Sequence, residues 1–163
     1  MLSVLKIENL AIVRDIEIEF ERGLNVLTGE TGAGKSIVLK AIELLTGKRA
    51  SAEVIRSGEE ACTVEALFLP RPGFVQELAG RNEQLEELAA AEELLIRRVI
   101  DQSGRSKIYA NGRLITGSLL QELAEPLIDL TAQHQHQMLL NAGNHLKLLD
   151  QFGVSLELLT KTG

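Results

Sequence analysis

The chain has 163 residues, 45% of them hydrophobic, so it can bury a substantial core as one domain. Its 23 acidic residues outnumber 17 basic ones, and the net charge of −6 gives no overall attraction for nucleic acid. No apolar run approaches the ~20 residues that a membrane span requires, and the N-terminus lacks the pattern of a signal peptide. Cys62 is the only cysteine, so no internal disulfide can form, as is usual in a reducing compartment. From these features together we expect a cytoplasmic protein without membrane contact.

Two strands and a third apolar segment are predicted before residue 28. Strands are expected over residues 4–10 and 15–20, because in the latter Ile16, Ile18 and Phe20 alternate with glutamates. The run 24–27 is short and apolar, which is typical of a buried strand.

The segment that follows fits the phosphate-binding pattern G-x-x-x-x-G-K-[ST]: it reads Gly29-Glu30-Thr31-Gly32-Ala33-Gly34-Lys35-Ser36. Glycines let the backbone bring its N–H groups close to phosphate oxygens. Lys35 supplies a positive charge, and the Ser36 hydroxyl suits Mg²⁺. An apolar run precedes the loop and a helix is predicted after it, over 36–46, so the motif predicts a site for a nucleoside triphosphate.

The remaining elements are read from periodicity and turn residues. A strand is predicted over 63–69, with one or two short amphipathic helices within 73–93. A helix is expected over 118–127, with Ser118 as its N-cap. A short strand over 127–130 and a helix over 138–150 complete the prediction.

A hairpin of strands 94–100 and 106–111 gathers positive charge in an otherwise acidic chain. Exposed cations on a ribbon can bind a DNA backbone, although they also serve solubility, so both readings stay open. The candidate DNA contacts are Arg97, Arg98, Arg105, Lys107 and Arg113.

Several segments together resemble the N-terminal head segment of RecN-type bacterial DNA repair proteins, relatives of the SMC and ABC ATPases. They are residues 7–13, 23–36, 49–51, 54–58, 97–100, 104–106, 111–112 and 133–137. The resemblance implies an α/β fold: the N-terminal lobe of an ABC/SMC-type P-loop head, with an antiparallel β-subdomain beside a mixed core sheet. It places this lobe over 1–150, and 151–163 would begin a connection to a coiled coil or end the segment.

The resemblance also implies ATP and Mg²⁺ as ligands. Gln133 aligns with the Q-loop glutamine that touches Mg²⁺ and the water near the γ-phosphate, so Lys35 and Gln133 would act in catalysis and Ser36 and Gln133 would hold the metal. Metal ligation by His134 and His136 is not expected, because no cysteine lies nearby.

Two parts that this superfamily needs for hydrolysis do not occur in the sequence: an apolar strand ending in Asp-Glu, and a serine-glycine-glycine signature. In the family they lie beyond a long coiled coil, in the C-terminal segment. The resemblance therefore implies ATP binding without turnover by this chain alone, hydrolysis with the C-terminal segment, and a homodimer of heads that sandwiches ATP. The location it implies is the bacterial cytoplasm, at the nucleoid.

Two other readings remain open. The chain could be the head segment of another SMC-like or ABC ATPase, which its downstream sequence would decide. It could also be a structural lobe that keeps the phosphate loop only as part of its fold, in which case Lys35→Ala would leave head association unchanged.

Overall fold

The computed structural model describes residues 1–28, 32–80, 82, 85, 88 and 91–130. The chain separates into two compact units, Met1–Asp129 and Leu130–Gly163, and the first contains every element described below. Within the described residues, no helix is long and apolar enough to cross a membrane.

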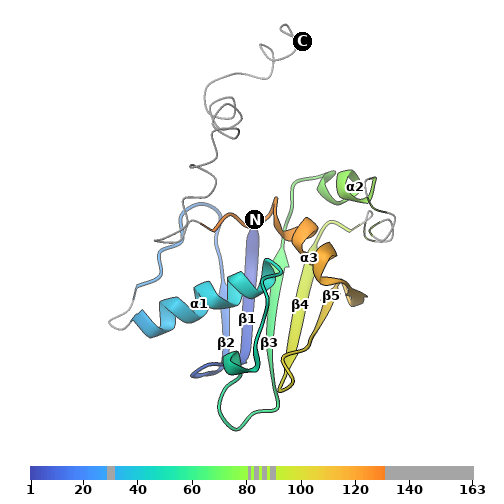
Figure 1. Ribbon diagram of the computed structural model, residues 1–163. Helices are drawn as coiled ribbons and strands as arrows, with labels where there is room; N and C mark the ends of the chain where they lie inside the picture. The colour runs from blue at the N-terminus through green and yellow to red at the C-terminus, as the bar shows by residue number, and fades with distance from the viewer. Residues whose placement is uncertain (29–31, 81, 83–84, 86–87, 89–90, 131–163) are drawn as a thin grey trace, which may run out of the picture. The chain divides into compact units, whose positions relative to one another are not determined.

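A six-stranded sheet forms the body of the first unit (Figure 1). All neighbouring strands are antiparallel, in the order β2-β1-β3-β4-β5-β6, which confirms the predicted antiparallel β-subdomain. The strands are β1 (Leu2–Leu10), β2 (Val13–Glu19), β3 (Ala61–Phe68), β4 (Leu94–Asp101), β5 (Ser106–Ala110) and β6 (Arg113–Ile115).

Alternation of side chains decides which face of the sheet is buried. In β3, Val64, Ala66 and Phe68 are at most 1% exposed, and the residues between them are half-buried. In β2, Ile16 and Ile18 pair with the buried Ile7 and Leu5 of β1, as the period-two pattern predicts. Ile16 is still 39% exposed, because β2 lies at the edge of the sheet.

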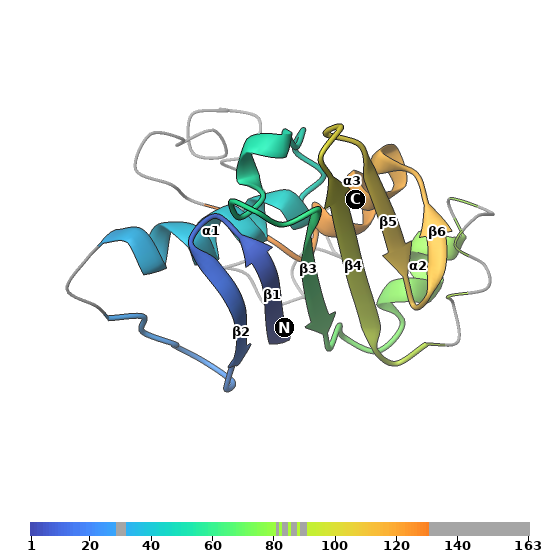
Figure 2. The same cartoon turned by 90° about the horizontal axis from the view of Figure 1, so that it is seen from below.

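Helices cover the buried face (Figure 2). The helix α1 (Gly32–Leu45) packs through Leu44 and Leu45, and α3 (Gly117–Ala124) packs through its predicted stripe of Leu119, Leu120 and Leu123. Two short elements complete the unit: η1 (Ala52–Val54), a turn of 3₁₀ helix, and α2 (Phe74–Ala79), which lies in the region predicted to hold short helices.

Three predictions around α3 are wrong: its N-cap, its end and the strand after it. Its N-cap is Thr116 rather than Ser118, because Thr116 has extended backbone and its hydroxyl accepts a 3.2 Å hydrogen bond from the Leu119 N–H. The helix ends at Ala124, before Pro126, and no strand forms over 127–130, where the chain makes a turn and then continues irregularly.

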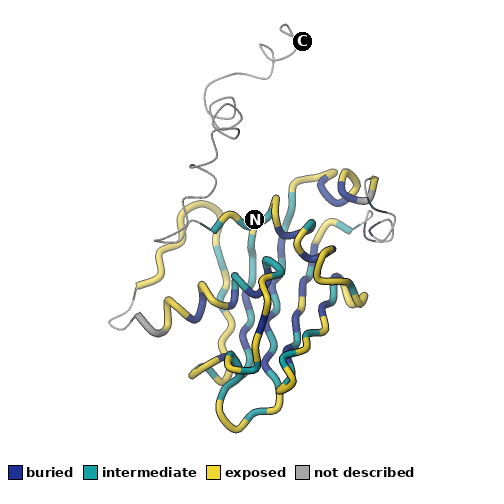
Figure 3. Tube along the Cα trace, viewed as in Figure 1, coloured by how far each residue is buried: buried dark blue, intermediate teal, exposed yellow. Residues whose placement is uncertain are grey.

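The predicted buried strand over 24–27 is also wrong. These residues form no strand, and Leu24 and Val26 are 90% and 71% exposed (Figure 3). A strand needs a neighbour to accept and donate its backbone hydrogen bonds, and within the described residues no strand pairs with this segment. The apolar sequence is therefore presented to solvent.

The buried Cys62 gives a prediction about stability at high pH. Its side chain is fully buried in β3, and burial raises the pKa of the thiol to about 11. In the unfolded chain a thiol ionises near pH 8.5, so between about pH 8.5 and 11 the unfolded state releases this proton while the native state keeps it. The free energy of unfolding therefore falls by about 3 kcal/mol across this range. The free energy of unfolding of the native chain, measured with urea at pH values from 7 to 10.5, should show this decrease.

The Cys62→Ala variant is the control for that series. Its unfolding free energy should fall less between pH 8.5 and 10.5 than that of the native chain, although the variant is less stable at neutral pH through lost packing. Equal slopes for the two proteins would contradict the prediction.

Candidate nucleotide-binding site

The predicted helix after the phosphate-binding pattern forms as α1, but it begins within the pattern, at Gly32 rather than at residue 36. Gly29, Glu30 and Thr31 lie outside the described residues, while Gly32 and Ala33 begin the helix. The next three residues, Gly34, Lys35 and Ser36, are exposed on the first turns of α1. Lys35 and Ser36 therefore come together at the exposed N-terminal end of this helix.

This end of α1 has the properties that a phosphate group requires. The first N–H groups of a helix have no carbonyl partner within the helix, and the helix dipole makes this end partly positive. The first turn of α1 contains no acidic residue. Apart from its chain neighbours and its own helix backbone, a Cβ placed on Gly34 would meet no described heavy atom within 4 Å, so the space beside this glycine is open. ATP phosphates and a Mg²⁺ ion on the Ser36 hydroxyl thus fit the residues present.

Gln133, His134 and His136 lie outside the described residues. The role of Gln133 as a second ligand of Mg²⁺ therefore stays a prediction.

The predicted basic hairpin forms, but Arg98 is not part of its exposed charge. Along β4, Leu94, Ile96, Arg98 and Ile100 all face the core, and Arg98 is only 4% exposed. Burial lowers the pKa of its guanidinium. The prediction that Arg98 contacts DNA is wrong, because its side chain points away from solvent.

The other four cations do not gather in one place. Arg97 and Lys107 lie on the open face of the sheet, and the Arg97 guanidinium sits 5.2 Å from the centre of the Tyr109 ring. Arg105 lies in the turn after β4, where its Nε donates to Ser103. Arg113 is on the short edge strand β6, in register with the buried Ala110 rather than with Tyr109.

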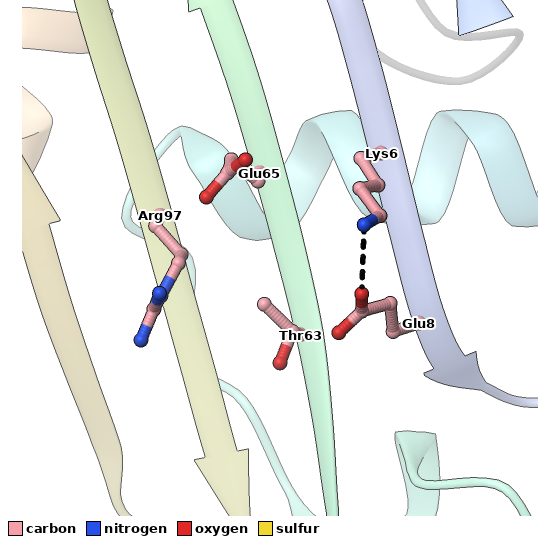
Figure 4. Close-up of a pocket in the computed structure, with 5 residues that line it drawn as sticks. All are labelled: Lys6, Glu8, Thr63, Glu65 and Arg97. Carbon is pink, nitrogen blue, oxygen red and sulfur yellow. Dashed lines mark ion pairs between the residues drawn. The ribbon is translucent and has the colours of Figure 1, made fainter. Parts of the chain in front are cut away.

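The open face of the sheet carries a polar hollow of about 330 Å³, lined by Lys6, Glu8, Thr63, Glu65 and Arg97 (Figure 4). Lys6 forms an ion pair with Glu8 at 3.1 Å, and this carboxylate raises the pKa of Lys6. Two carboxylates in the lining disfavour a phosphate, and α1 lies behind the sheet in this view. The hollow is not the nucleotide site.

Alternation along β4 gives a partial signal for the position of Arg98. Residues 94, 96 and 100 are large aliphatics, which favours the core for that face, but the other face also carries Leu95 and Val99 beside Arg97. Neighbouring arginines 97 and 98 therefore had to point to opposite faces.

Comparison with known proteins agrees with this architecture. Residues 5–156 match the family described as AAA domain. The DNA repair protein RecN of Bacillus subtilis is 44% identical over 99% of this chain, and RecN of Vibrio cholerae is 40% identical over 99%. The chain spans only 28% and 29% of the lengths of these two relatives.

A solved structure gives the same fold at lower identity. It comes from work on the ATP-driven dimerization and DNA-stimulated activation of SMC ATPases. It superposes with a TM-score of 0.61 at 22% identity, covering 98% of this chain and 95% of that one. The chain therefore belongs to the AAA domain family, is similar in sequence to RecN proteins over almost its whole length, and shares the fold of this solved structure.

Proposed function

We propose that this chain is the ATP-binding N-terminal part of a RecN-like SMC-family protein that acts in recombinational repair of DNA double-strand breaks. The observation that carries the proposal is the phosphate-loop sequence at the exposed N-terminus of α1, with Lys35 and Ser36 on its first turns. The identity to RecN along almost the whole chain supports the repair function.

In this proposal each residue of the site has a defined task. The loop backbone over 29–34 binds phosphate oxygens, Lys35 neutralises charge on the β- and γ-phosphates, and Ser36 and Gln133 hold Mg²⁺. ATP bound here is sandwiched between two heads and drives their dimerisation. Hydrolysis belongs to the complete head, because this sequence has no Asp-Glu strand end to activate water.

The first partner we propose is the C-terminal segment of the same protein. The exposed apolar run 24–27 lacks a strand neighbour within the described part of the chain. A strand from the C-terminal segment would pair with its backbone and bury Leu24, Val26 and Leu27.

The second partner we propose is DNA, in the bacterial cytoplasm at the nucleoid. Arg97 and Lys107 share the open face of the sheet, and Arg105 and Arg113 extend the positive charge to the turn and the edge strand. Contact of these exposed cations with phosphates would be sequence-independent and would weaken with salt.

Calorimetry of Mg·ATP binding tests the proposal, with ATPase activity recorded alongside. We expect the chain alone to bind Mg·ATP without turnover, and turnover to appear after the separately produced C-terminal segment is added. Turnover by the chain alone would mean that a catalytic carboxylate lies within this sequence. Absence of binding in both mixtures would favour a structural lobe that keeps the loop as a fold element.

A further inference from the structure

Arg98 is the only buried charged residue within the described part of the chain. Its Nη1 donates to the Leu44 carbonyl at 2.6 Å and to the Lys48 carbonyl at 2.7 Å, and its Nη2 donates to the Ser106 hydroxyl at 3.0 Å. No carboxylate among the described residues forms an ion pair with it. The charge is therefore held by backbone carbonyls and one hydroxyl.

These carbonyls lie in the last turn of α1 and just beyond its C-terminal end. Leu44 is in the last turn of the helix, and Lys48 follows Gly47, whose positive φ of 82° turns the chain away from the helix. One guanidinium nitrogen from β4 thus joins the last turn of α1 to the chain that leaves it. A cation at this position also meets the negative end of the helix dipole.

The core holds the C-terminal end of α1 more closely than the N-terminal end. Near the C-terminal end, Ala41, Leu44 and Leu45 are at most 1% exposed. In the N-terminal half Ile37 and Val38 are also buried, at 8% and 7% exposure, and residues 34–36 before them are exposed. Lys35 lies nine residues before Leu44 in this helix, which corresponds to about 14 Å along its axis. A tilt of about 5° at the anchored end would move Lys35 by about 1 Å at this length.

We propose that Arg98 is a positioning residue for the nucleotide site: by fixing the C-terminal end of α1 to β4, it sets the place of the phosphate loop at the other end. This inference rests on the proposed ATP-binding function. A misplacement of about 1 Å in an active site can lower the reaction rate about 10²-fold. We expect the contacts of Lys35 and Ser36 with ATP to depend on position in the same way, although Arg98 itself touches no ligand.

The test compares Arg98→Met with Arg71→Met in the full-length protein. Arg71 is a suitable control, since it forms an exposed ion pair with Glu77, and among the described residues no ion pair joins it to α1. We expect amide hydrogen exchange in α1 to accelerate at least tenfold in Arg98→Met, with β1 and β3 unchanged, and Mg·ATP affinity to fall at least tenfold. Arg71→Met should change neither measurement.

Several outcomes would overturn the inference. Unchanged exchange in α1, or acceleration spread equally over β1 and β3, would mean that Arg98 does not hold α1 specifically. Faster exchange in α1 with normal ATP affinity would mean that the anchor does not set the loop. If the native protein fails to bind ATP, the proposed function fails, and the positioning role for ATP fails with it, while the exchange data still decide whether Arg98 anchors α1.

A second variant is needed because Arg98→Met could prevent folding. Arg98→Lys keeps the charge but has no planar fork to reach both the helix carbonyls and Ser106. It should fold, with faster exchange in α1 and weaker ATP binding than Ser106→Ala, which removes only one of the three contacts. Equal behaviour of these two variants would contradict the anchoring of α1 by Arg98.

Discussion

Replacing Lys35 with alanine is expected to weaken Mg·ATP binding by at least a hundredfold and to leave the free energy of unfolding within about 0.5 kcal/mol of the native value. Lys35 is exposed on the first turns of α1, so its removal opens no cavity. A cation at ~4 Å from a phosphate oxygen contributes on the order of 4 kcal/mol at an effective dielectric near 20, before desolvation is subtracted. Calorimetry of Mg·ATP binding and urea unfolding measure the two effects.

The matched control is Lys40→Ala on the same helix. Lys40 is also exposed, and its ammonium lies 3.5 Å from the Glu43 carboxylate, so this variant removes the same charge further from the loop. It should bind Mg·ATP with nearly native affinity. Equal affinities for the two variants would show that Lys35 does not contact phosphate and would support the structural alternative.

The antiparallel sheet could be predicted from the sequence because its signal is local. Alternation within β2 and β3 identifies both the strand and its buried face, and the turn residues between β4 and β5 identify the hairpin. The presence of α1 was predictable for a similar reason, since the phosphate-loop pattern itself specifies a loop followed by a helix. Its start was not, because the helix begins at Gly32, four residues before the predicted residue 36.

Features that depend on distant contacts were harder to predict. The N-cap of α3 depended on which of two nearby hydroxyls, Thr116 or Ser118, has extended backbone. The role of Arg98 depended on carbonyls of Leu44 and Lys48, which lie about fifty positions away in sequence. Alternation along a strand shows that Arg97 and Arg98 lie on opposite faces of the sheet. It does not show which helix end Arg98 binds through its hydrogen bonds.

The run 24–27 shows why hydrophobicity alone does not make a strand. Its composition suits a buried strand. Burial also requires a neighbouring strand that forms hydrogen bonds with the backbone N–H and C=O groups, and the described residues provide none. The sequence therefore indicates a segment that can form a buried strand only when a partner strand is present. In the structure of this chain the segment is exposed.

Replacing Val26 with aspartate is accordingly expected to have little effect on this chain and a large effect on its assembly with the C-terminal segment. Val26 is 71% exposed, so the unfolding free energy should change by less than about 0.5 kcal/mol. In the proposed assembly the side chain is buried, and an unpaired carboxylate there costs several kcal/mol. The affinity for the C-terminal segment, measured by calorimetry, should fall at least a hundredfold.

The control is Leu114→Asp, which places the same charge at a residue that is 68% exposed on the edge strand β6. It should leave association unchanged, because our proposal assigns no contact of the C-terminal segment to β6. Equal weakening by both variants would indicate a general effect of added negative charge. Native association of Val26→Asp would mean that the apolar run stays exposed in the complete head, and that the C-terminal segment docks on a different surface of this lobe.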